Sequence, residues 1–356
     1  MGTVLIIGNG YDLKCGLNTK YSDFFNWCKA NTPGFKQLAN LNPSSIMVQG
    51  TIQDAFTHPE ITLWDLYFTF KSSTFSKDKW CNVEEEINQS FKSSFWYDVL
   101  NQINYFQENS DWGTMDDDWF FSWAINERYF SNNNWMWQGK LPQQIIKVRV
   151  VTDKEFFDVL FKELNQLEQR FATYLKSELE AKKSIFESKQ LELLRIILNQ
   201  TSFEKPIKVV SFNYTNVITK IDALDIQSIN IHGVVDGRPI FGISAINNRN
   251  QSTEQFTKAS RRLADDLPPL SDFIDTDDNT VVFYGTSLND LDYDYYYHLI
   301  RLFNKTKKIY FCYSNYDAID RKTEQIDLSK KLIDKIYSET FYQLRESGRV
   351  KILKVN

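Results

Sequence analysis

The sequence predicts an α/β protein built on a Rossmann-like, mostly parallel sheet of about six strands that is covered by helices. Three observations support this fold class. An apolar run at residues 3–7 stops at a Gly-Asn-Gly turn, as the first, central strand of a parallel sheet does. After Pro206, short apolar runs alternate with helical stretches, which is typical of a sheet covered on both faces. Between these parts, a long region with helical periodicity predicts a large, mainly helical insertion.

The first strand is expected to lead through its glycine turn into a helix. Asn18 or Thr19 can cap this helix, because the side-chain oxygens of both residue types accept hydrogen bonds from a first helical turn. The apolar residues that follow recur at three- and four-residue spacing and define a buried face; they are Tyr21, Phe24, Phe25 and Cys28. Residues 1–32 are therefore expected to form one strand–turn–helix unit.

Residues 33–205 are expected to form a mainly helical, aromatic-rich insertion after this unit. The stretch 33–59 is rich in Asn, Pro, Gly and Ser, which predicts loop and short helix. A helix is predicted from Trp80 onward. The longest helix is predicted from residue 153 to about 199, where leucine and phenylalanine keep one face through several turns. The stretch 111–139 is dense in Trp, Asp and Asn without a clear period, so no element is assigned to it.

The remaining strands are expected after Pro206. Predicted strands cover residues 207–212, 228–231, 239–243, 280–285, 308–312 and 350–353. Helices are predicted at residues 292–303 and 323–345. The sequence thus predicts a Rossmann-like core formed by residues 1–32 and 206–356, with residues 33–205 looped out between them.

Composition and charge exclude several classes of function. The formal net charge of -5 and the pI near 5.5 give no cationic footprint for a nucleic-acid backbone, so nucleic acid is not expected as a partner. No stretch reaches the ~18 consecutive apolar residues of a membrane span, and no secretory signal is recognised. The four cysteines lack the C-x-x-C spacing of a zinc site and suggest no disulfide framework. We therefore expect a cytoplasmic protein that needs no metal.

Polar and glycine-rich residues follow four of the predicted strands. Ligands of parallel α/β sheets bind outside the carboxyl ends of the strands, so these residues are candidates for a binding site. Glycine turns let backbone amides approach anionic phosphates. The candidates are Gly8, Asn9, Gly10, Tyr11, Asp12, Asn213, Thr215, His232, Gly233, Gly285, Thr286, Ser287, Asp290 and Asp292. A flexible turn, an amide, an imidazole and a hydroxyl-bearing glycine turn are together the parts that a dinucleotide site needs.

Each of these signals alone also has a purely structural interpretation. The first glycine turn departs from the dinucleotide fingerprint G-x-G-x-x-G because Leu13 occupies the third glycine position, and tight turns carry glycine for steric reasons alone. Asn213 could cap a following helix. His232 could be a satisfied polar residue at a strand end. The acidic run from Asp290 to Asp294 suits the dipole at a helix N-terminus.

These residues resemble the AbiH family of bacterial phage abortive-infection proteins. The motifs that carry the resemblance are Ile7-Gly8-Asn9-Gly10-Tyr11-Asp12-Leu13, Tyr21-Ser22-Asp23-Phe24, the helix start at Trp80 to Glu84, Phe212-Asn213-Tyr214-Thr215, Ile231-His232-Gly233, Phe241-Gly242-Ile243 and Tyr284-Gly285 to Asp292. They span the first and last thirds of the chain and touch the insertion only at Trp80 to Glu84. The resemblance implies antiviral defence by abortive infection, with a phage protein as a candidate trigger.

The same motif order is similar, more distantly, to sirtuin-type NAD-binding domains. This resemblance implies NAD as substrate or ligand: Asn213 would hold a water and the nicotinamide ribose, and His232 would act on a ribose hydroxyl. Two features depart from the sirtuin pattern. Thr215 stands where sirtuins and related phage-defence NADases tend to have Asp, which affects hydrogen bonding on the nicotinamide side. The sirtuin zinc module is missing, which argues against protein deacylation.

We therefore expect an anti-phage effector that hydrolyses NAD at the nicotinamide-ribosyl bond, through an oxocarbenium-like transition state. Asn213 would orient the attacking water, neutral His232 would accept a proton from a ribose hydroxyl, and Asp12 would bind the ribose or a site amide. The other candidates would bind the nucleotide, with Gly8, Asn9, Gly10 and Gly285 at the pyrophosphate and ribose, and Thr286 and Ser287 donating to the ribose.

Two alternatives stay open at the level of sequence. The same pocket could sense NAD, ADP-ribose or a related nucleotide without turning it over. The protein could instead be a nuclease or translation-blocking toxin, in which Asp290, Asp292 and Asp294 would bind metal. The aromatic stretch from Trp112 to Trp137 could be a lid, a sensor of a phage protein or a contact in a homo-oligomer.

Overall fold

The computed structural model describes residues 2–39, 58–70, 83–109, 119–130, 150–221, 224–245, 251–274, 280–302, 308–315 and 320–355. The chain folds into two compact units. The sheet unit comprises Met1–Lys20, Phe171–Arg249 and Thr257–Asn356, and the helical unit comprises Tyr21–Arg170 and Asn250–Phe256. The division falls inside helix α9 (Asp153–Gln200), so it differs in its bounds from the predicted division after residues 32 and 205.

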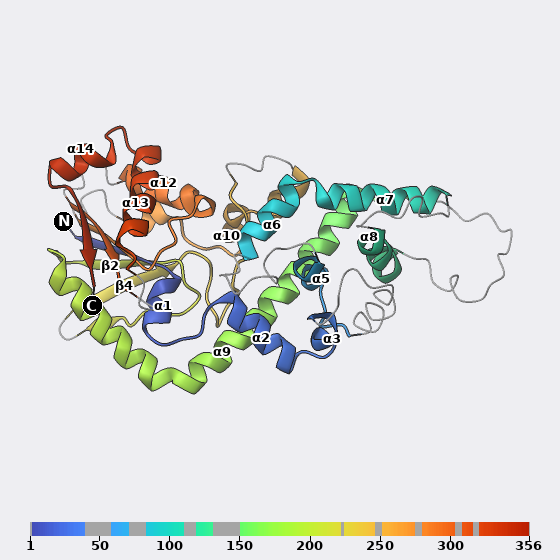
Figure 1. Cartoon of the computed structure of the whole chain (residues 1–356), viewed down its shortest axis with the longest axis horizontal. Helices are drawn as coiled ribbons and strands as arrows, with labels where there is room; N and C mark the ends of the chain where they lie inside the picture. Colours follow the sequence, from blue (N-terminus) through green and yellow to red (C-terminus); the bar gives the residue numbers. More distant parts are fainter. Residues whose placement is uncertain are drawn as a thin grey trace. The chain divides into compact units, whose positions relative to one another are not determined.

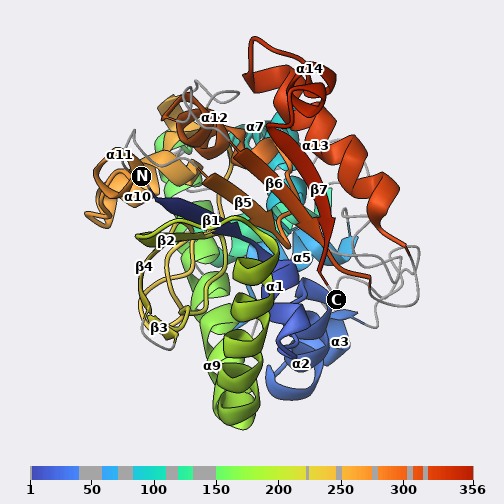
Figure 2. The same ribbon diagram turned by 90° about the vertical axis from the view of Figure 1, so that its left-hand side faces the viewer.

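The sheet unit is built on seven strands in the order β3-β4-β2-β1-β5-β6-β7 (Figure 2). Their bounds are β1 (Thr3–Ile7), β2 (Ile207–Ser211), β3 (Lys220–Ile221), β4 (Leu224–Asn230), β5 (Thr280–Tyr284), β6 (Lys308–Tyr313) and β7 (Val350–Lys354). All neighbouring pairs are parallel except β3 and β4, which are antiparallel. The predicted α/β class with a mostly parallel sheet is confirmed.

Along the chain, the parallel strands take positions successively farther from β1, first on one side of it and then on the other. Numbered in chain order, the six parallel strands have the arrangement 3-2-1-4-5-6. The chain places β2 and β4 on one side of β1, and then crosses to place β5, β6 and β7 on the other. The strand order therefore reverses at the carboxyl ends of β1 and β5, and ligands of doubly wound sheets bind beside such a point.

One predicted strand is wrong. The apolar run Pro239–Ile243 has an irregular backbone with a single bridge, which joins Ile243 to Thr257. Part of its backbone is satisfied by a side chain, because the Arg261 guanidinium donates to the Phe241 carbonyl (2.5 Å). The run is buried although it pairs with no strand, and burial alone accounts for its apolar residues.

Successive residues of β1 face opposite sides of the sheet, so the sheet separates two apolar cores. Val4 and Ile6 belong to one core, and Leu5 and Ile7 to the other. The first core includes residues from α11 (Leu270–Phe273), α12 (Tyr293–Leu302), α13 (Lys322–Ile336) and α14 (Phe341–Glu346). The second includes residues from α1 (Asn9–Lys14) and the C-terminal part of α9. Both faces of the sheet are thus covered by helices, as predicted.

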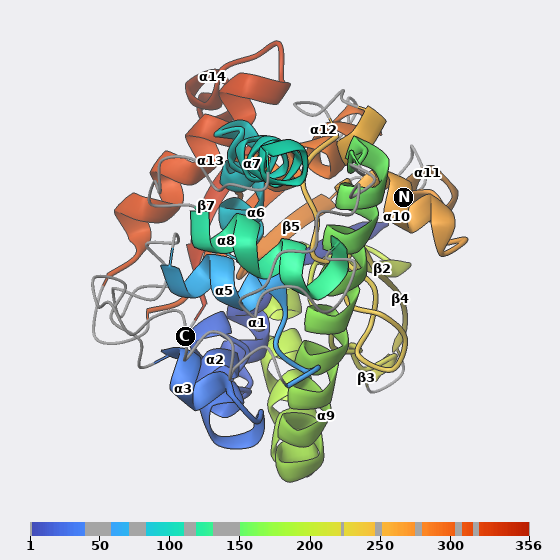
Figure 3. The same cartoon turned by 90° about the vertical axis from the view of Figure 1, so that its right-hand side faces the viewer.

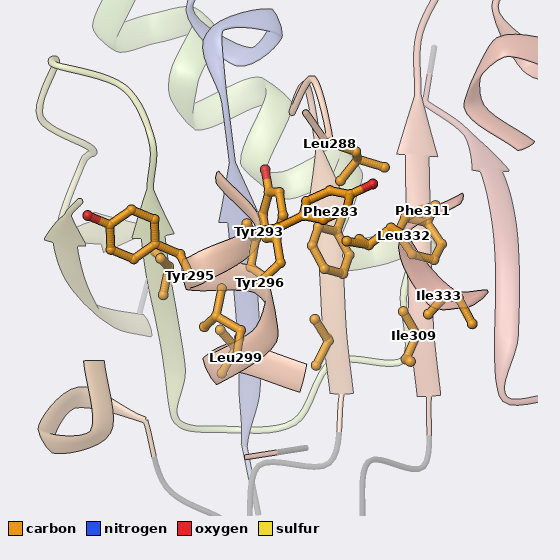
Figure 4. Packing of buried hydrophobic residues seen from close by; sticks show 14 of the residues in the cluster. Phe283, Leu288, Tyr293, Tyr295, Tyr296, Leu299, Ile309, Phe311, Leu332 and Ile333 are labelled. Atoms are coloured by element: carbon orange, nitrogen blue, oxygen red, sulfur yellow. The ribbon is translucent and has the colours of Figure 1, made fainter. Parts of the chain in front are cut away.

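The first core carries aromatic rings that fix α12 against the sheet (Figure 4). Phe283 of β5 stacks on Phe311 of β6, with ring centroids 4.8 Å apart. Tyr296 of α12 packs against Phe283 at 6.0 Å. Tyr293, Tyr296 and Leu299 are spaced by three residues and so share one face of the helix. This packing also fixes the acidic turn that immediately precedes α12.

The helical unit consists of short helices and the N-terminal part of α9 (Figures 1 and 3). Its other elements are α2 (Tyr21–Asn31), α3 (Phe35–Ala39), α5 (Leu63–Phe70), α6 (Val83–Lys92), α7 (Phe95–Asn109), α8 (Trp119–Ile125), a π-helical turn (Asn126–Phe130) and a 3-10 turn (Gln251–Phe256). The predicted long helix is confirmed by α9. Trp80, the predicted helix start, and most of the stretch 112–137 lie outside the described residues.

Within this unit, the Trp64 ring and a buried acid attach α5 to α7 and α9. The Trp64 ring lies 5.2 Å from the Trp96 ring, and its Nε1 donates to the Leu160 carbonyl (3.0 Å). The Glu163 carboxylate accepts a hydrogen bond from the Leu63 backbone N (2.8 Å), at the first turn of α5. Burial raises the pKa of Glu163 to about 7. None of the helices in the described part of the chain is long and apolar enough to cross a membrane.

The turn after β1 packs directly on the turn after β5. The Gly10 N donates to the Gly285 carbonyl at 2.8 Å, and the Gly8 N donates to the Tyr284 carbonyl at 3.1 Å. A Cβ at Gly285 would lie 2.5 Å from the Tyr11 N, and a Cβ at Gly8 or Gly10 would lie 2.7 Å from backbone of the β5 turn. Gly285 also has a φ of +66°, which favours glycine. The two turns approach too closely for a side chain.

We predict that Gly285→Ala destabilises the sheet unit by about 2–5 kcal/mol, since the left-handed backbone and the overlap both oppose a Cβ. Gly348 is a matched control, because its φ is +75° but a Cβ there would meet nothing within 4 Å. Gly348→Ala should cost only about 1–2 kcal/mol. Urea unfolding followed by circular dichroism measures both, and equal losses would contradict the close approach of the two turns.

Candidate functional site

The first buried polar cluster joins the ends of β1 and β2. The Asp12 Oδ1 accepts a hydrogen bond from the Asn213 Nδ2 (3.0 Å), and its Oδ2 accepts one from the Thr215 Oγ1 (2.8 Å). All three side chains are at most 3% exposed. We call Asp12, Asn213 and Thr215 the Asp12 cluster. Three residues that were predicted as site residues from separate parts of the sequence therefore meet in space.

The backbone that carries this cluster is held by two further polar side chains. The Asn230 Nδ2, at the end of β4, donates to the carbonyls of Asn213 (2.8 Å) and Thr215 (2.9 Å). The Ser211 Oγ accepts a hydrogen bond from the Asn213 N (3.1 Å). These bonds satisfy buried backbone groups of an irregular turn and fix the direction of its side chains. Asn213 does not cap a helix, since the residues that follow it are irregular until β3.

The Asp12 carboxyl has an unusual proton affinity. Burial raises its pKa to about 7, while the hydrogen bonds from Thr215 and Asn213 lower it and offset part of that effect. Both donors are neutral, so no positive charge in the Asp12 cluster compensates an ionised carboxylate. The carboxyl is therefore poised to change its protonation state near neutral pH.

The second cluster contains His232, Asp292 and Lys258, which we call the His232 cluster. The Asp292 Oδ1 lies 2.7 Å from the Lys258 Nζ and 3.1 Å from the His232 Nε2. Lys258 is 2% exposed, His232 4% and Asp292 7%. Burial raises the pKa of Asp292, but the positive charge of Lys258, together with the nearby His232, outweighs it and holds this pKa below its usual range. Asp292 is therefore ionised at neutral pH.

Helix α10 (Lys258–Ala264) supplies the lysine and holds the backbone near His232. Its Thr257 cap accepts a hydrogen bond from the Ser260 N (3.3 Å). The Arg262 guanidinium donates to the carbonyls of Ile231 (2.7 Å) and Pro268 (2.7 Å). Since Ile231 directly precedes His232, α10 fixes the backbone that carries the imidazole. The same helix carries Lys258, whose ammonium lies on the other side of the Asp292 carboxylate.

The turn after β2 connects the two clusters. Its residues Asn213 and Thr215 bind Asp12, while the rings of Phe212 and Tyr214 lie beside His232, with centroids 5.3 and 6.2 Å from the imidazole. Along this short segment, every second side chain contacts the Asp12 cluster, and the side chains between them lie beside the His232 cluster. The clusters lie on two sides of one turn, at the carboxyl end of the sheet.

The predicted glycine residues have steric roles. The backbone N–H groups of Gly8, Gly10 and Tyr11 all donate to backbone carbonyls, so these three groups are engaged. Gly233 has a φ of +76°, and a Cβ there would lie 2.0 Å from the Arg238 carbonyl oxygen. Glycine is thus required at these turns by the approach of other backbone.

Other predicted residues lie outside both clusters. The Asn9 side chain forms hydrogen bonds with Thr19. The Tyr11 ring is fully buried in the second core, and its hydroxyl donates to the Gln190 carbonyl (3.5 Å). Thr286 is buried beside the Tyr296 hydroxyl, whereas Ser287 on the same turn is exposed.

The acidic run that could bind metal is divided among different partners. Asp290 is exposed and pairs with Lys331 (3.0 Å). Asp294 accepts hydrogen bonds from Ser244 (2.9 Å) and from the backbone N of Ala245 (2.9 Å). Asp292 belongs to the His232 cluster. The three carboxylates therefore do not converge.

Sequence reasoning missed Lys258 and Asn230. Both are polar residues that usually lie on the surface, and nothing in the local sequence indicates that they are enclosed. The Thr257 cap before an amphipathic stretch could have indicated the helix, but it could not have indicated the contact of Lys258 with Asp292.

We predict that Asp12→Asn removes a pH-dependent loss of stability. The folded-state pKa of about 7 lies above the usual value of 3.8, so the favourable contribution of Asp12 is present below pH 3.8 and is lost as the pH rises through 7. Asn keeps a hydrogen-bonding group at both positions without the charge. Asp12→Asn should therefore be more stable than wild type at about pH 8, by on the order of 2–4 kcal/mol, and not at about pH 4.

Urea unfolding at several pH values measures this difference. Asp225→Asn, at an exposed carboxyl on β4, is the control and should follow the wild-type profile. If the free energy of unfolding depended on pH in the same way for wild type and Asp12→Asn, burial of the Asp12 carboxylate would not destabilise the folded protein.

Comparison with protein families identifies the chain. The family described as bacteriophage abortive infection AbiH matches residues 4–313, a range that contains both clusters. A search of curated proteins gave no match. The more distant sirtuin-like resemblance stays a prediction. The chain belongs to the AbiH family of bacteriophage abortive infection proteins, and membership implies a role in phage abortive infection.

Proposed function

We propose that the protein acts in abortive infection by hydrolysing NAD at the nicotinamide-ribosyl bond. The observation that carries this proposal is the pair of buried clusters on two sides of the turn Phe212–Thr215. They lie where the strands of a doubly wound, Rossmann-like sheet end, which is where such folds bind nucleotides. Amide, imidazole and carboxylate groups are held there in fixed orientations.

The reaction joins water to C1′ of the nicotinamide ribose, breaks the bond to nicotinamide and releases a proton. Its transition state has oxocarbenium character, so the protein mainly has to position the ribose and the water. The Asn213 Nδ2 is committed to Asp12, which leaves its Oδ1 to accept a hydrogen bond from the water or a ribose hydroxyl. Asp12 thus orients the Asn213 amide, and this amide orients the water and the ribose.

His232 is proposed to accept the proton. Its Nε2 faces the ionised Asp292 and therefore carries a hydrogen, which leaves Nδ1 as the acceptor in the neutral ring. The surrounding rings of Phe212, Tyr214 and Tyr295 limit the access of bulk water to this imidazole. A positioned base of this kind contributes roughly 10²–10⁴-fold to a rate.

The proposed contacts to the pyrophosphate differ from those expected from the sequence. Since the Gly8, Gly10 and Tyr11 amides already donate to backbone carbonyls, they do not provide a ready cradle for phosphate. We assign this role to the hydroxyl of the exposed Ser287 instead, on the turn after β5. The close packing of the glycine turns then serves to hold this turn beside β1.

Purified wild-type protein, and phage-infected cells that contain it, should convert NAD to nicotinamide and ADP-ribose. His232→Ala and Asn213→Ala should each slow this conversion by about 100-fold or more. His298→Ala, at an exposed histidine on α12, is the control and should retain full activity. Chromatography of nucleotides measures all four proteins, and circular dichroism checks that they fold.

Two outcomes would reject hydrolysis. Wild-type protection against phage with unchanged NAD, lost in the His232 and Asn213 variants, would show that the clusters act in another way. Calorimetric binding of intact NAD without release of nicotinamide would support the alternative of a nucleotide-sensing module.

A further inference from the structure

We propose that Lys258 is a positioning residue of this site: it holds Asp292, and Asp292 fixes the His232 ring with Nδ1 as its proton acceptor. The inference rests on the proposed function only where it gives Nδ1 the role of proton acceptor in NAD hydrolysis. Its structural part concerns the three side chains of the His232 cluster, and it can be tested without any substrate.

The geometry places one carboxylate oxygen between two nitrogen groups. The Asp292 Oδ1 lies 2.7 Å from the Lys258 Nζ and 3.1 Å from the His232 Nε2. The three residues come from separate segments: α10, the 3-10 turn Asp290–Asp292, and the residues after β4. All are buried, so their interaction is only weakly screened by solvent.

Charge balance explains why a lysine is needed. A buried carboxylate without a cation costs several kcal/mol or takes up a proton. Lys258 supplies a fixed positive charge, so that Asp292 can remain ionised beside a neutral His232 whose Nε2 lies 3.1 Å from the Asp292 Oδ1. Without Lys258, Asp292 would be a buried carboxylate without a fixed cation and would take up a proton. A neutral Asp292 would no longer select which ring nitrogen of His232 carries the hydrogen, so Nδ1 would not be held as the acceptor.

The fold gives Lys258 little freedom to act otherwise. Arg261 and Arg262 on the same helix bind the carbonyls of Phe241 (2.5 Å) and Ile231 (2.7 Å), which fixes α10 against the backbone beside His232. Lys258 is 2% exposed and its ammonium points at Asp292. Lys258 therefore acts through Asp292 and not by contact with solvent.

The test is nitrogen NMR of protein labelled with ¹⁵N-histidine, at one neutral pH. The chain has three histidines, His58, His232 and His298, so His58→Gln and His298→Gln variants assign the spectrum. In wild type, we expect His232 as a single neutral form with its hydrogen on Nε2. In Lys258→Met, His232 should become a mixture of forms, and Lys258→Arg should restore the wild-type signal.

Circular dichroism shows whether each variant is folded. Asp292→Asn, which changes the shape little, is a second variant in case Lys258→Met does not fold; it should also remove the single His232 form. Wild-type His232 shifts in a folded Lys258→Met protein, or in folded Asp292→Asn, would overturn the proposal.

Activity provides a separate readout. If wild type hydrolyses NAD, Lys258→Met should lower kcat on the order of 100-fold and change KM little, because Lys258 does not bind substrate. A rise in KM alone would contradict a positioning role. If wild type does not hydrolyse NAD, the proposed function fails, whereas the His232 spectra still decide what Lys258 does.

Discussion

The hydrogen bonds from Asn213 and Thr215 to the Asp12 carboxylate are the interaction on which the rest of the site depends. They join the ends of two adjacent strands that are separated in the chain by about two hundred residues, including Tyr21–Arg170 of the helical unit. They also set the direction of the intervening residues. Because Asn213 and Thr215 face Asp12, Phe212 and Tyr214 lie beside His232. A change at Asp12 is therefore expected to reach the imidazole through a single turn of backbone.

Much of the fold could be predicted because it follows from continuous patterns of apolar residues. The mainly β-branched run Thr3–Ile7 becomes the central strand, and the repeated Leu and Phe of residues 153–199 become part of α9. The error at Pro239–Ile243 has the same origin, since a short apolar run indicates burial whether or not its backbone pairs. Within the site, residues directly after strands could be found by position alone. Lys258 could not, because its burial depends on the tertiary approach of α10 to the turn before α12.

The glycine turn shows how one sequence signal can have a different physical cause from the expected one. The sequence predicts Gly8-Asn9-Gly10 as a turn whose backbone amides can approach a phosphate. In the structure, the same glycines admit the backbone of Gly285, whose own φ of +66° requires glycine. The two turns are therefore mutually dependent, and both are needed to bring the carboxyl ends of β1 and β5 together. Through this packing they place the side chains of the neighbouring residues.

Asp12 and Asp292 are both buried carboxyls, but their surroundings move their pKa values in opposite directions. Asp12 receives hydrogen bonds only from neutral groups, so burial dominates and its pKa rises to about 7. Asp292 faces Lys258 and His232, and the positive charge of Lys258, together with the nearby imidazole, outweighs burial and lowers its pKa. Two carboxyls separated in this way take different roles in a single site. Asp292 remains an anion and orients the imidazole. Asp12 instead changes its protonation state near neutral pH, and this change alters the group that accepts the hydrogen bond from Asn213.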